Sequence, residues 1–221
     1  MIKNLAVTVG IVGLSIIVNQ HQLEAHEPAI SLKADAPYFT FDGQDRQLSL
    51  GNSPVVQVSK GDFTVEAKVL FRSLDGNDGP CLGPGCDMSI ADKMSDKCVV
   101  NCDGWRLIKQ SSNLIYFCLG RQDKEDGCAI FSNTRVVGKT KIQINTWHHI
   151  FATKKGNDIA IYINGIREDA KNASGYKDTN QTGLLVGASR LEGAHLNGAI
   201  DLVKLYGAAL SQSEIMYRST H

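Results

Sequence analysis

Six cysteines are the residues of this sequence that most clearly suggest chemistry. They are Cys81, Cys86, Cys98, Cys102, Cys118 and Cys128. An even number of cysteines in an exported chain predicts disulfide bonds, because the compartments outside the cytosol are oxidising. Cys118 ends one apolar run and Cys128 begins another, with a polar, glycine-bounded stretch between them. This pattern predicts a hairpin whose two strands are joined by a disulfide between Cys118 and Cys128.

The remaining four cysteines allow two chemistries. Cys81 and Cys86 are spaced as C-x4-C, and Cys98 and Cys102 as C-x3-C. Two local disulfides are the preferred interpretation, although the sequence does not fix their connectivity. Four thiolates at such spacings could also hold a structural zinc ion. Because an oxidising compartment favours disulfides, we expect disulfides here rather than zinc.

The N-terminal segment supports export. Lys3 is followed by an uncharged run from Leu5 to Val18, which has the length of the apolar part of a signal peptide and is short for a membrane span. Ala25 is a suitable small residue before a cleavage point. We expect residues 1–25 to be a signal peptide, and the mature chain to be secreted, periplasmic or at the cell surface without a membrane partner. An uncleaved signal anchor is the alternative.

The histidines and carboxylates do not form a recognisable catalytic pattern. His148 and His149 are neighbours in a predicted strand and point to opposite faces, so they cannot readily hold one metal ion, and Trp147 before them is expected to anchor the core or a sheet face. Glycoside hydrolases need two nearby carboxylates, but Lys68 stands two residues after Glu66. The sequence also lacks an H-E-x-x-H metal motif and a G-x-S-x-G elbow. We therefore expect no enzymatic activity.

The composition is that of an ordinary globular protein. Of the 221 residues, 43% are hydrophobic and 21% are charged, which argues against a disordered chain. Basic and acidic residues are equal in number, 23 of each, so the formal net charge is zero. This balance provides no electrostatic reason to expect nucleic acid or an anionic membrane as a partner.

Strand patterns supply the framework for these residues. Apolar and polar residues alternate from Phe63 to Val69, and the apolar run from Ile159 to Ile163 leads into Asn164-Gly165, a pair that favours a tight hairpin turn. Ser211 and Glu214 form a capping box, which predicts one short helix near the C-terminus. Short strands with regular turns between them are typical of β-sandwiches and barrels.

These patterns predict an all-β chain with a single domain. We expect the domain to cover residues 38–218, preceded by a short N-terminal lead over residues 26–37. The strand patterns fit either a β-sandwich or a barrel, and in both cases one short C-terminal helix follows the strands.

Several segments resemble one protein family, in the order in which that family has them. They are Tyr38-Phe39-Thr40-Phe41-Asp42-Gly43, Gly61-Asp62-Phe63-Thr64-Val65-Glu66-Ala67, Asn145-Thr146-Trp147-His148-His149-Ile150, Ile161-Tyr162-Ile163-Asn164-Gly165, Leu184-Leu185-Val186-Gly187, Asn197 to Tyr206, and Ala209 to Ile215. Each segment is weak alone, but their ordered sum resembles the laminin-G-like, concanavalin A-like jelly-roll domains. The resemblance implies a curved sandwich of two antiparallel sheets. It implies less about activity, because this fold carries lectins, adhesion modules, hydrolases and lyases.

The resemblance also suggests a structural calcium ion. In many sandwiches of this kind the first and last strands are neighbours, and calcium bridges them through carboxylate and backbone oxygens, which are the ligands that this ion prefers. Asp42 and Asp201 are the candidates in this sequence. Alternatively, Asp42 stabilises the turn at Gly43 and Asp201 bonds to the backbone.

The segment from Asp75 to Asp103 departs from the family pattern and is rich in oxygen-bearing side chains. Long loops on a rigid scaffold often carry recognition. Asp87, Asp103 and Trp105 are therefore the candidate ligand-binding residues, with the Trp105 ring available to stack on a sugar. The alternative places Trp105 in the core beneath a surface cover.

These observations together predict an exported, non-catalytic binding module. Its expected partner is a glycan or an extracellular surface protein, bound through loops or the concave face of the sandwich. One alternative is a structural envelope or matrix protein without sugar binding. The other is an unrecognised polysaccharide hydrolase or lyase, although related lyases have a Q-I-H strand and this chain has Asn145 in place of that histidine.

Overall fold

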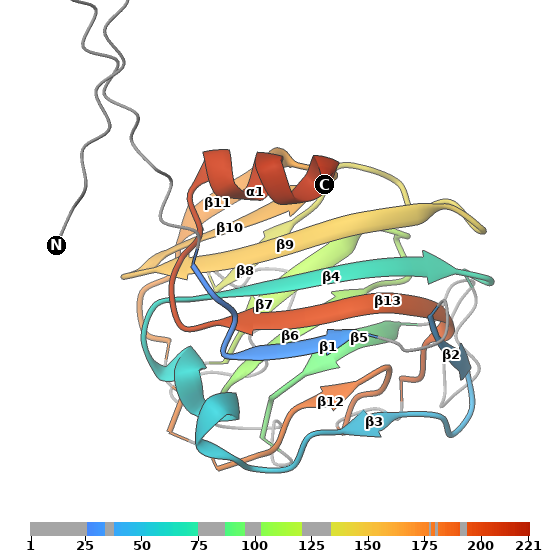
Figure 1. The fold of residues 1–221 in the computed structure, drawn as a ribbon, viewed down its shortest axis with the longest axis horizontal. Coiled ribbons are helices and arrows are strands. Elements are labelled where there is room, and N and C mark those ends of the chain that lie inside the picture. Colours follow the sequence, from blue (N-terminus) through green and yellow to red (C-terminus); the bar gives the residue numbers. More distant parts are fainter. Residues whose placement is uncertain are drawn as a thin grey trace, which may run out of the picture.

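The computed structural model describes residues 26–33, 38–74, 87–95, 103–120, 134–176, 178–179, 181–190 and 194–221. The predicted signal peptide, most of the segment from Asp75 to Asp103, and the cysteines other than Cys118 lie outside these residues. The described chain folds into two stacked antiparallel sheets with one 3-10 helix and one α-helix (Figure 1). The predicted all-β sandwich is confirmed.

The larger sheet, sheet A, has seven strands. Its order is β1-β13-β4-β9-β10-β11, and β2 also pairs with β13. The bounds are β1 (Ile30–Lys33), β2 (Phe39–Asp42), β4 (Phe63–Phe71), β9 (Trp147–Lys155), β10 (Asp158–Ile163), β11 (Ile166–Asn172) and β13 (Asn197–Tyr206). The hairpin between β10 and β11 turns at Asn164 and Gly165, whose φ angles of 51° and 82° are the positive values that the predicted tight turn requires.

The second sheet, sheet B, has six strands in the order β3-β12-β5-β6-β7-β8. The bounds are β3 (Leu48–Ser49), β12 (Leu185–Val186), β5 (Met88–Asp92), β6 (Trp105–Lys109), β7 (Ile115–Leu119) and β8 (Arg135–Val137). Cys118 on β7 is disulfide-bonded, and the residue opposite it on β8 is Arg135. Because Cys128 lies outside the described residues, its pairing with Cys118 stays a prediction.

The sheet begins earlier than the sequence suggested. Strand β1 lies inside the segment that was expected to be a lead, and it pairs with β13 along its whole length. Ile30 and Leu32 alternate with polar residues, and both pack against the core. The alternation of apolar and polar residues that predicted the later strands is thus also present in β1, but over only four residues, which is too short to be recognised from the sequence.

The 3-10 helix η1 (Pro54–Lys60) is a second element that the sequence patterns did not predict. It starts at Pro54, where a missing backbone N–H costs nothing because the first turn leaves it unbonded in any case. Val56 is buried in the main core. No described helix is both long enough and apolar enough to cross a membrane.

The main core fills the space between the sheets. Phe63 of β4, Trp105 of β6 and Phe117 of β7 lie together there, each with no exposed surface. The ring centroid of Trp105 lies 5.8 Å from that of Phe63 and 6.5 Å from that of Phe117. Aromatic pairs at such distances contribute beyond the area that they bury, so this trio links the two sheets.

A smaller apolar cluster lies on the other face of sheet A, beneath helix α1 (Gln212–Thr220). It consists of Phe151, Ala160, Tyr162, Tyr206, Leu210 and Ile215. Ser211 is the N-cap of α1, and with Glu214 it forms the predicted capping box. Figure 1 shows α1 lying across the β9, β10 and β11 side of the sheet, which leaves the β13 and β4 side of this outer face open.

Candidate functional site

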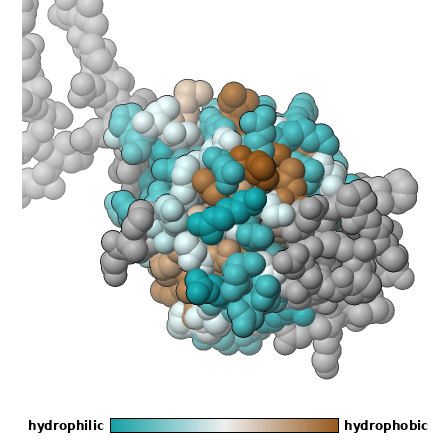
Figure 2. Space-filling view, turned by 90° about the vertical axis from the view of Figure 1, so that its right-hand side faces the viewer, coloured by the Kyte–Doolittle hydropathy of each residue, from teal (hydrophilic) through white to brown (hydrophobic). Residues whose placement is uncertain are grey.

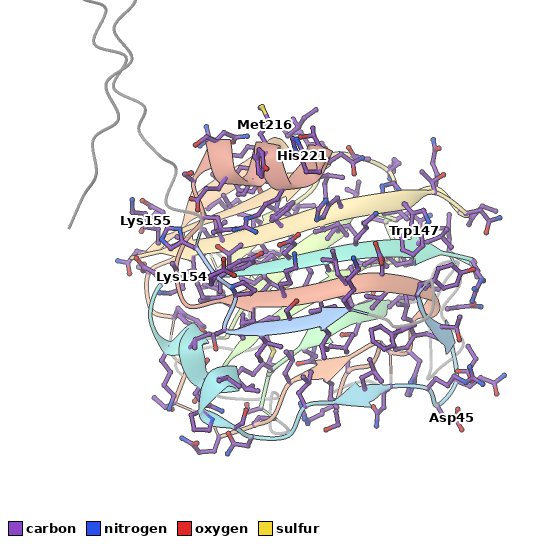
Figure 3. The ribbon with its side chains drawn as sticks, in the orientation of Figure 1. Asp45, Trp147, Lys154, Lys155, Met216 and His221 are labelled. Atoms are coloured by element: carbon purple, nitrogen blue, oxygen red, sulfur yellow. The ribbon has the colours of Figure 1, made fainter. Side chains whose placement is uncertain are left out.

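An open groove on the outer face of sheet A is the candidate functional site. It has a volume of about 600 Å³ and lies between the last turns of α1 and the uncovered strands. Its lining consists of Lys33, Glu66, Lys68, Trp147, His149, Asn164, Asp201, Leu202, Lys204, Tyr217, Arg218, Ser219, Thr220 and His221. We call it the outer groove. Figure 3 shows Trp147 at one end of β9, with His221 at the end of α1.

The strand register explains why these residues share one surface. Lys68 of β4 lies opposite His149 of β9 on one side and Leu202 of β13 on the other. Trp147 lies two residues before His149, and side chains two apart on a strand point to the same face. The period-2 pattern therefore places Trp147, His149 and Lys68 together on the outer face.

Trp147 forms the aromatic end of the groove. Its ring is half-buried and packs against Tyr38, with 5.7 Å between the ring centroids. The ammonium of Lys68 lies 5.9 Å from the centre of the indole. Trp147 is thus a sheet-face anchor, as predicted, but on the outer face, where part of the ring stays accessible.

Glu66 lies at the floor of the groove, and its carboxylate is fully engaged. The hydroxyl of Tyr206 donates to Oε2 at 2.5 Å, His149 Nε2 lies 2.9 Å from Oε1, and Lys204 Nζ lies 3.8 Å from Oε1. Burial raises the pKa of Glu66, but the bonds from His149 and Tyr206 and the charge of Lys204 outweigh it, so that the pKa lies below its ordinary value. Glu66 is therefore a structural anion rather than a proton donor at neutral pH.

The second carboxylate of the groove is also paired. Asp201 lies 3.1 Å from the ammonium of Lys68. The register of β13 shifts between Ile200 and Leu202, and this irregularity presents Asp201 at the groove. With Glu66 and Asp201 both engaged, the described lining holds no carboxylate that is placed to act alone as a nucleophile or acid.

A pH prediction follows from Glu66. Its pKa is lower in the folded chain than the ordinary value of 4.5, so the folded state binds fewer protons than the unfolded state below that pH. The stabilisation from Glu66 is present above pH 4.5 and is lost as the pH falls below it. We expect the Glu66→Gln variant to show a smaller drop in unfolding free energy than the wild type over this acid range. Urea unfolding between about pH 3 and pH 7 measures the difference; parallel curves would contradict it.

The two adjacent histidines point to opposite faces, as the strand period predicted. His148 points inward, is 3% exposed, and accepts a bond from the Gln143 backbone N–H at 3.4 Å. Burial lowers the pKa of His148, which favours the neutral ring. His149 points outward, and its ring lies against Phe151 with 4.6 Å between centroids. The two side chains therefore belong to different environments.

A second cavity, of about 580 Å³, lies on the other side of the start of α1. Its lining includes two residues with small side chains, Ala160 and Ala170, and three cations, Lys155, Arg167 and Lys171. Tyr162, the aromatic residue in the part of this lining that the structure describes, is only 6% exposed and packs under α1. Because it offers little aromatic surface, it is a weaker candidate than the outer groove.

The predicted ligand-binding residues do not gather at one open surface. Trp105 has no exposed area, so a sugar cannot stack on its ring in the folded chain, and this expectation is corrected. Asp103 is 7% exposed and accepts two bonds from Thr179, from the backbone N–H at 2.8 Å and from the hydroxyl at 2.5 Å. Asp87 accepts a bond from the Ser111 backbone N–H at 3.1 Å. Both carboxylates thus have structural contacts that fasten loops.

The two predicted calcium ligands also lie apart. Asp42 is opposite Asn197 on β13, and Asp201 lies four residues further along that strand, which corresponds to about 13 Å. Asp42 accepts a bond from the Gln44 backbone N–H at 3.0 Å, as expected of a turn residue, and its pKa is lowered by that bond. No group of three metal-binding side chains occurs among the described residues. The structure does not support an ion shared by Asp42 and Asp201, and calcium at either residue stays a prediction.

Sequence reasoning missed the outer groove, although part of its signal was present. The alternation of Trp147 and His149 already placed both on one face. What the sequence did not reveal is the position of α1, which covers Phe151 and leaves Trp147 open. The groove forms because the last turns of α1, an element far away in the sequence, lie beside the strand residues Trp147 and His149.

Solved structures with this fold include sugar-binding and protein-binding domains. A carbohydrate-binding module, the CBM40 of Ruminococcus gnavus IT-sialidase bound to α2,3-sialyllactose, matches with a TM-score of 0.65 and 10% identity, over 87% of this chain and 99% of that one. The leech intramolecular trans-sialidase matches with a TM-score of 0.63 and 11% identity, over 88% of this chain and 28% of that one. The botulinum neurotoxin DC binding domain in complex with rat synaptotagmin II matches with a TM-score of 0.57 and 15% identity, over 79% and 39%.

At such low identities the likeness shows the fold alone. A search of curated proteins by sequence found no significant match. The family model for the concanavalin A-like lectin/glucanases superfamily, by contrast, matches residues 42–216. These residues include most strands of both sheets and the start of α1. The chain belongs to the concanavalin A-like lectin/glucanases superfamily.

Proposed function

We propose that the mature chain is an exported, non-catalytic module that binds a glycan in the outer groove. The observation that carries this proposal is the partly open indole of Trp147 beside a lining rich in charged and hydrogen-bonding side chains. A sugar ring has an apolar face that can lie on an aromatic ring, and its hydroxyl groups need polar partners in the same site. The outer groove offers both within one hollow of about 600 Å³.

The charges of the lining favour an acidic sugar. The cations are Lys33, Lys68, Lys204 and Arg218, and the carboxylates are Glu66 and Asp201. Since the whole chain has a formal net charge of zero, this excess of positive charge is a local feature of the groove. The sialyllactose bound by the Ruminococcus gnavus module supports the proposal, because that sugar carries a carboxylate.

The same lining supports a binding role over catalysis. A glycosidase needs one carboxylate as acid and another as base or nucleophile. Glu66 is held by Tyr206 and His149, and Asp201 by Lys68. A groove with both carboxylates engaged can hold a sugar but has no described group ready to cleave it.

A second candidate function is recognition of a protein. Ile166, Met216 and Tyr217 are 67%, 54% and 59% exposed. Gly165, the residue before Ile166, approaches Met216 and Ser219 of α1. The neurotoxin domain that binds synaptotagmin supports this candidate. Figure 2 shows hydrophobic and hydrophilic side chains interspersed over one side of the molecule.

Screening on a glycan array, followed by titration of the best sugar, tests the proposal. We expect the wild type to prefer acidic glycans, and Trp147→Ala to weaken binding by about tenfold or more. Trp147→Phe keeps an aromatic face and should retain part of the affinity. Lys204→Ala removes a cation from the outer groove. Its matched control is Arg167→Ala, which removes an exposed charge at the second cavity.

The outcomes separate the candidate functions. Loss of sugar binding in Trp147→Ala and Lys204→Ala, but not in Arg167→Ala, supports the outer groove. Binding to no glycan on the array would contradict the proposal and leave the protein-binding or structural envelope and matrix roles. Turnover of a polysaccharide by the purified chain would contradict the non-catalytic assignment.

A further inference from the structure

An irregularity of β13 places a carboxylate in the outer groove. The register of β13 against β4 passes from Ile200 directly to Leu202, which lies opposite Lys68, so that Asp201 is an extra residue in the strand. Ile200 and Val203 both belong to the main core, and Asp201 and Leu202 between them both line the groove. Such irregularities often redirect a side chain next to a functional site. Here the redirected carboxylate lies 3.1 Å from the ammonium of Lys68.

The ion pair between Lys68 and Asp201 is loosely held. The two side chains are 41% and 23% exposed, and ion pairs that are open to water contribute little to stability. The second contact of the Lys68 ammonium, with the Trp147 ring at 5.9 Å, is near the outer limit for a cation–π contact. An anion that enters the groove can therefore replace Asp201 at Lys68 at a small cost.

We propose that Lys68 selects for a carboxylate on the bound sugar, and that Asp201 takes the place of this carboxylate until the sugar binds. This inference rests on the proposed function and specifies the ligand as a sugar whose ring lies on Trp147 and carries a carboxylate. In the complex, the carboxylate of the sugar pairs with the ammonium of Lys68, and Asp201 turns toward the solvent.

The strand register places Lys68 beside the position of that sugar. Lys68 lies opposite His149, and Trp147 precedes His149 by two residues on the same face. Lys68 and Trp147 are thus diagonal neighbours on β4 and β9, a separation that long side chains can bridge. Lys204 lies further into the groove, 3.8 Å from Glu66 Oε1 at its floor. A carboxylate on a sugar that lies on Trp147 can therefore reach the ammonium of Lys68.

The exchange would let the groove distinguish acidic sugars from neutral ones. A carboxylate replaces one anion by another at Lys68, so the ammonium stays paired in the complex. A neutral analogue cannot make this replacement and has only its hydroxyl groups and its ring face to offer. Because specificity is a difference between two affinities, this one contact can produce the preference. The preference should decrease at high salt, which screens exposed charges.

The test compares sugars that differ only in this charge. Sialyllactose and its carboxyl methyl ester form one pair, and a disaccharide that ends in glucuronic acid and its methyl ester form the other. We expect the purified protein to bind at least one of the two acids about tenfold or more tightly than its ester in isothermal titration. The pair that shows this preference identifies the acid as a sialic acid or a uronic acid.

Two variants should change the preference in opposite directions. Lys68→Met removes the ammonium but keeps the aliphatic stem, so the preference for the acid should fall to about twofold or less. Asp201→Asn removes the competing carboxylate and should raise the preference by about two- to fivefold. The matched control is Lys171→Met, which changes the net charge equally at the exposed second cavity and should keep the preference of the wild type. Circular dichroism verifies that each variant is folded.

The results separate this inference from the proposed function. Equal binding of acid and ester by the wild type, or binding of neither acid, would overturn the role of Lys68. The proposed function would still stand if the glycan array identified a neutral sugar whose binding depends on Trp147. An unchanged preference in Lys68→Met, or a reduced preference in Asp201→Asn, would likewise overturn the inference.

Discussion

Trp105→Ala is expected to lower the free energy of unfolding by about 3–5 kcal/mol, the usual cost of removing a buried aromatic side chain. Trp105 has no exposed area and packs between Phe63 of one sheet and Phe117 of the other. Its removal leaves a cavity at the junction of the two sheets, which the surrounding strands cannot close. Urea unfolding monitored by circular dichroism measures the loss.

The matched control is the same change at the other tryptophan. Trp147 is half-buried on the outer face and contacts Tyr38, so Trp147→Ala should cost no more than about 1 kcal/mol. The two variants should thus differ in kind, with Trp105→Ala losing stability and Trp147→Ala losing sugar affinity. Equal losses of stability would show that the burial of Trp105 does not distinguish the two positions.

Asp178→Ala is expected to destabilise the chain by about 3–5 kcal/mol, as does the removal of one partner from a buried ion pair. Asp178 accepts bonds from the Lys93 ammonium at 2.8 Å and 3.1 Å, and neither side chain is exposed. The hydroxyl of Ser59 donates to the same carboxylate at 2.5 Å. The loss should appear as a lower urea midpoint with an unchanged slope.

The double variant Lys93→Met with Asp178→Ala provides the control. Replacing both partners of a buried pair by apolar residues often costs little, because no charge is left behind. We therefore expect the double variant to be more stable than Asp178→Ala alone. A double variant that is less stable than Asp178→Ala would contradict the view that the loss comes from keeping the buried Lys93 ammonium without the Asp178 carboxylate.

The sequence predicted those elements whose local pattern matches their environment. Phe63 to Val69 alternates because one face of β4 meets the core and the other the outer surface. Asn164 and Gly165 adopt the positive φ angles that these two residue types tolerate best. Ser211 and Glu214 cap a helix that starts at the next residue after Ser211. In each case the physical reason for the local structure can be read from a few residues that are close together in the sequence.

The sequence could not predict features that depend on distant partners. On β6, Trp105, Arg106 and Leu107 are all buried, so polarity does not alternate as it does on β4. Arg106 is tolerated there because its guanidinium lies 3.2 Å from Asp92 on the neighbouring strand. Nothing in the local sequence shows that partner, and the same lack of information made Trp105 a candidate for the surface.

The measurement that tests the central claim most directly is a titration of ¹⁵N-labelled protein with the glycan that binds best on the array, followed by NMR. The chain contains two tryptophans, so its spectrum holds two indole N–H signals, and Trp147→Phe assigns them. We predict that the Trp147 signal shifts as the glycan saturates the protein, while the signal of the buried Trp105 stays in place. A Trp147 signal that does not move at saturation would contradict the assignment of the outer groove as the sugar site.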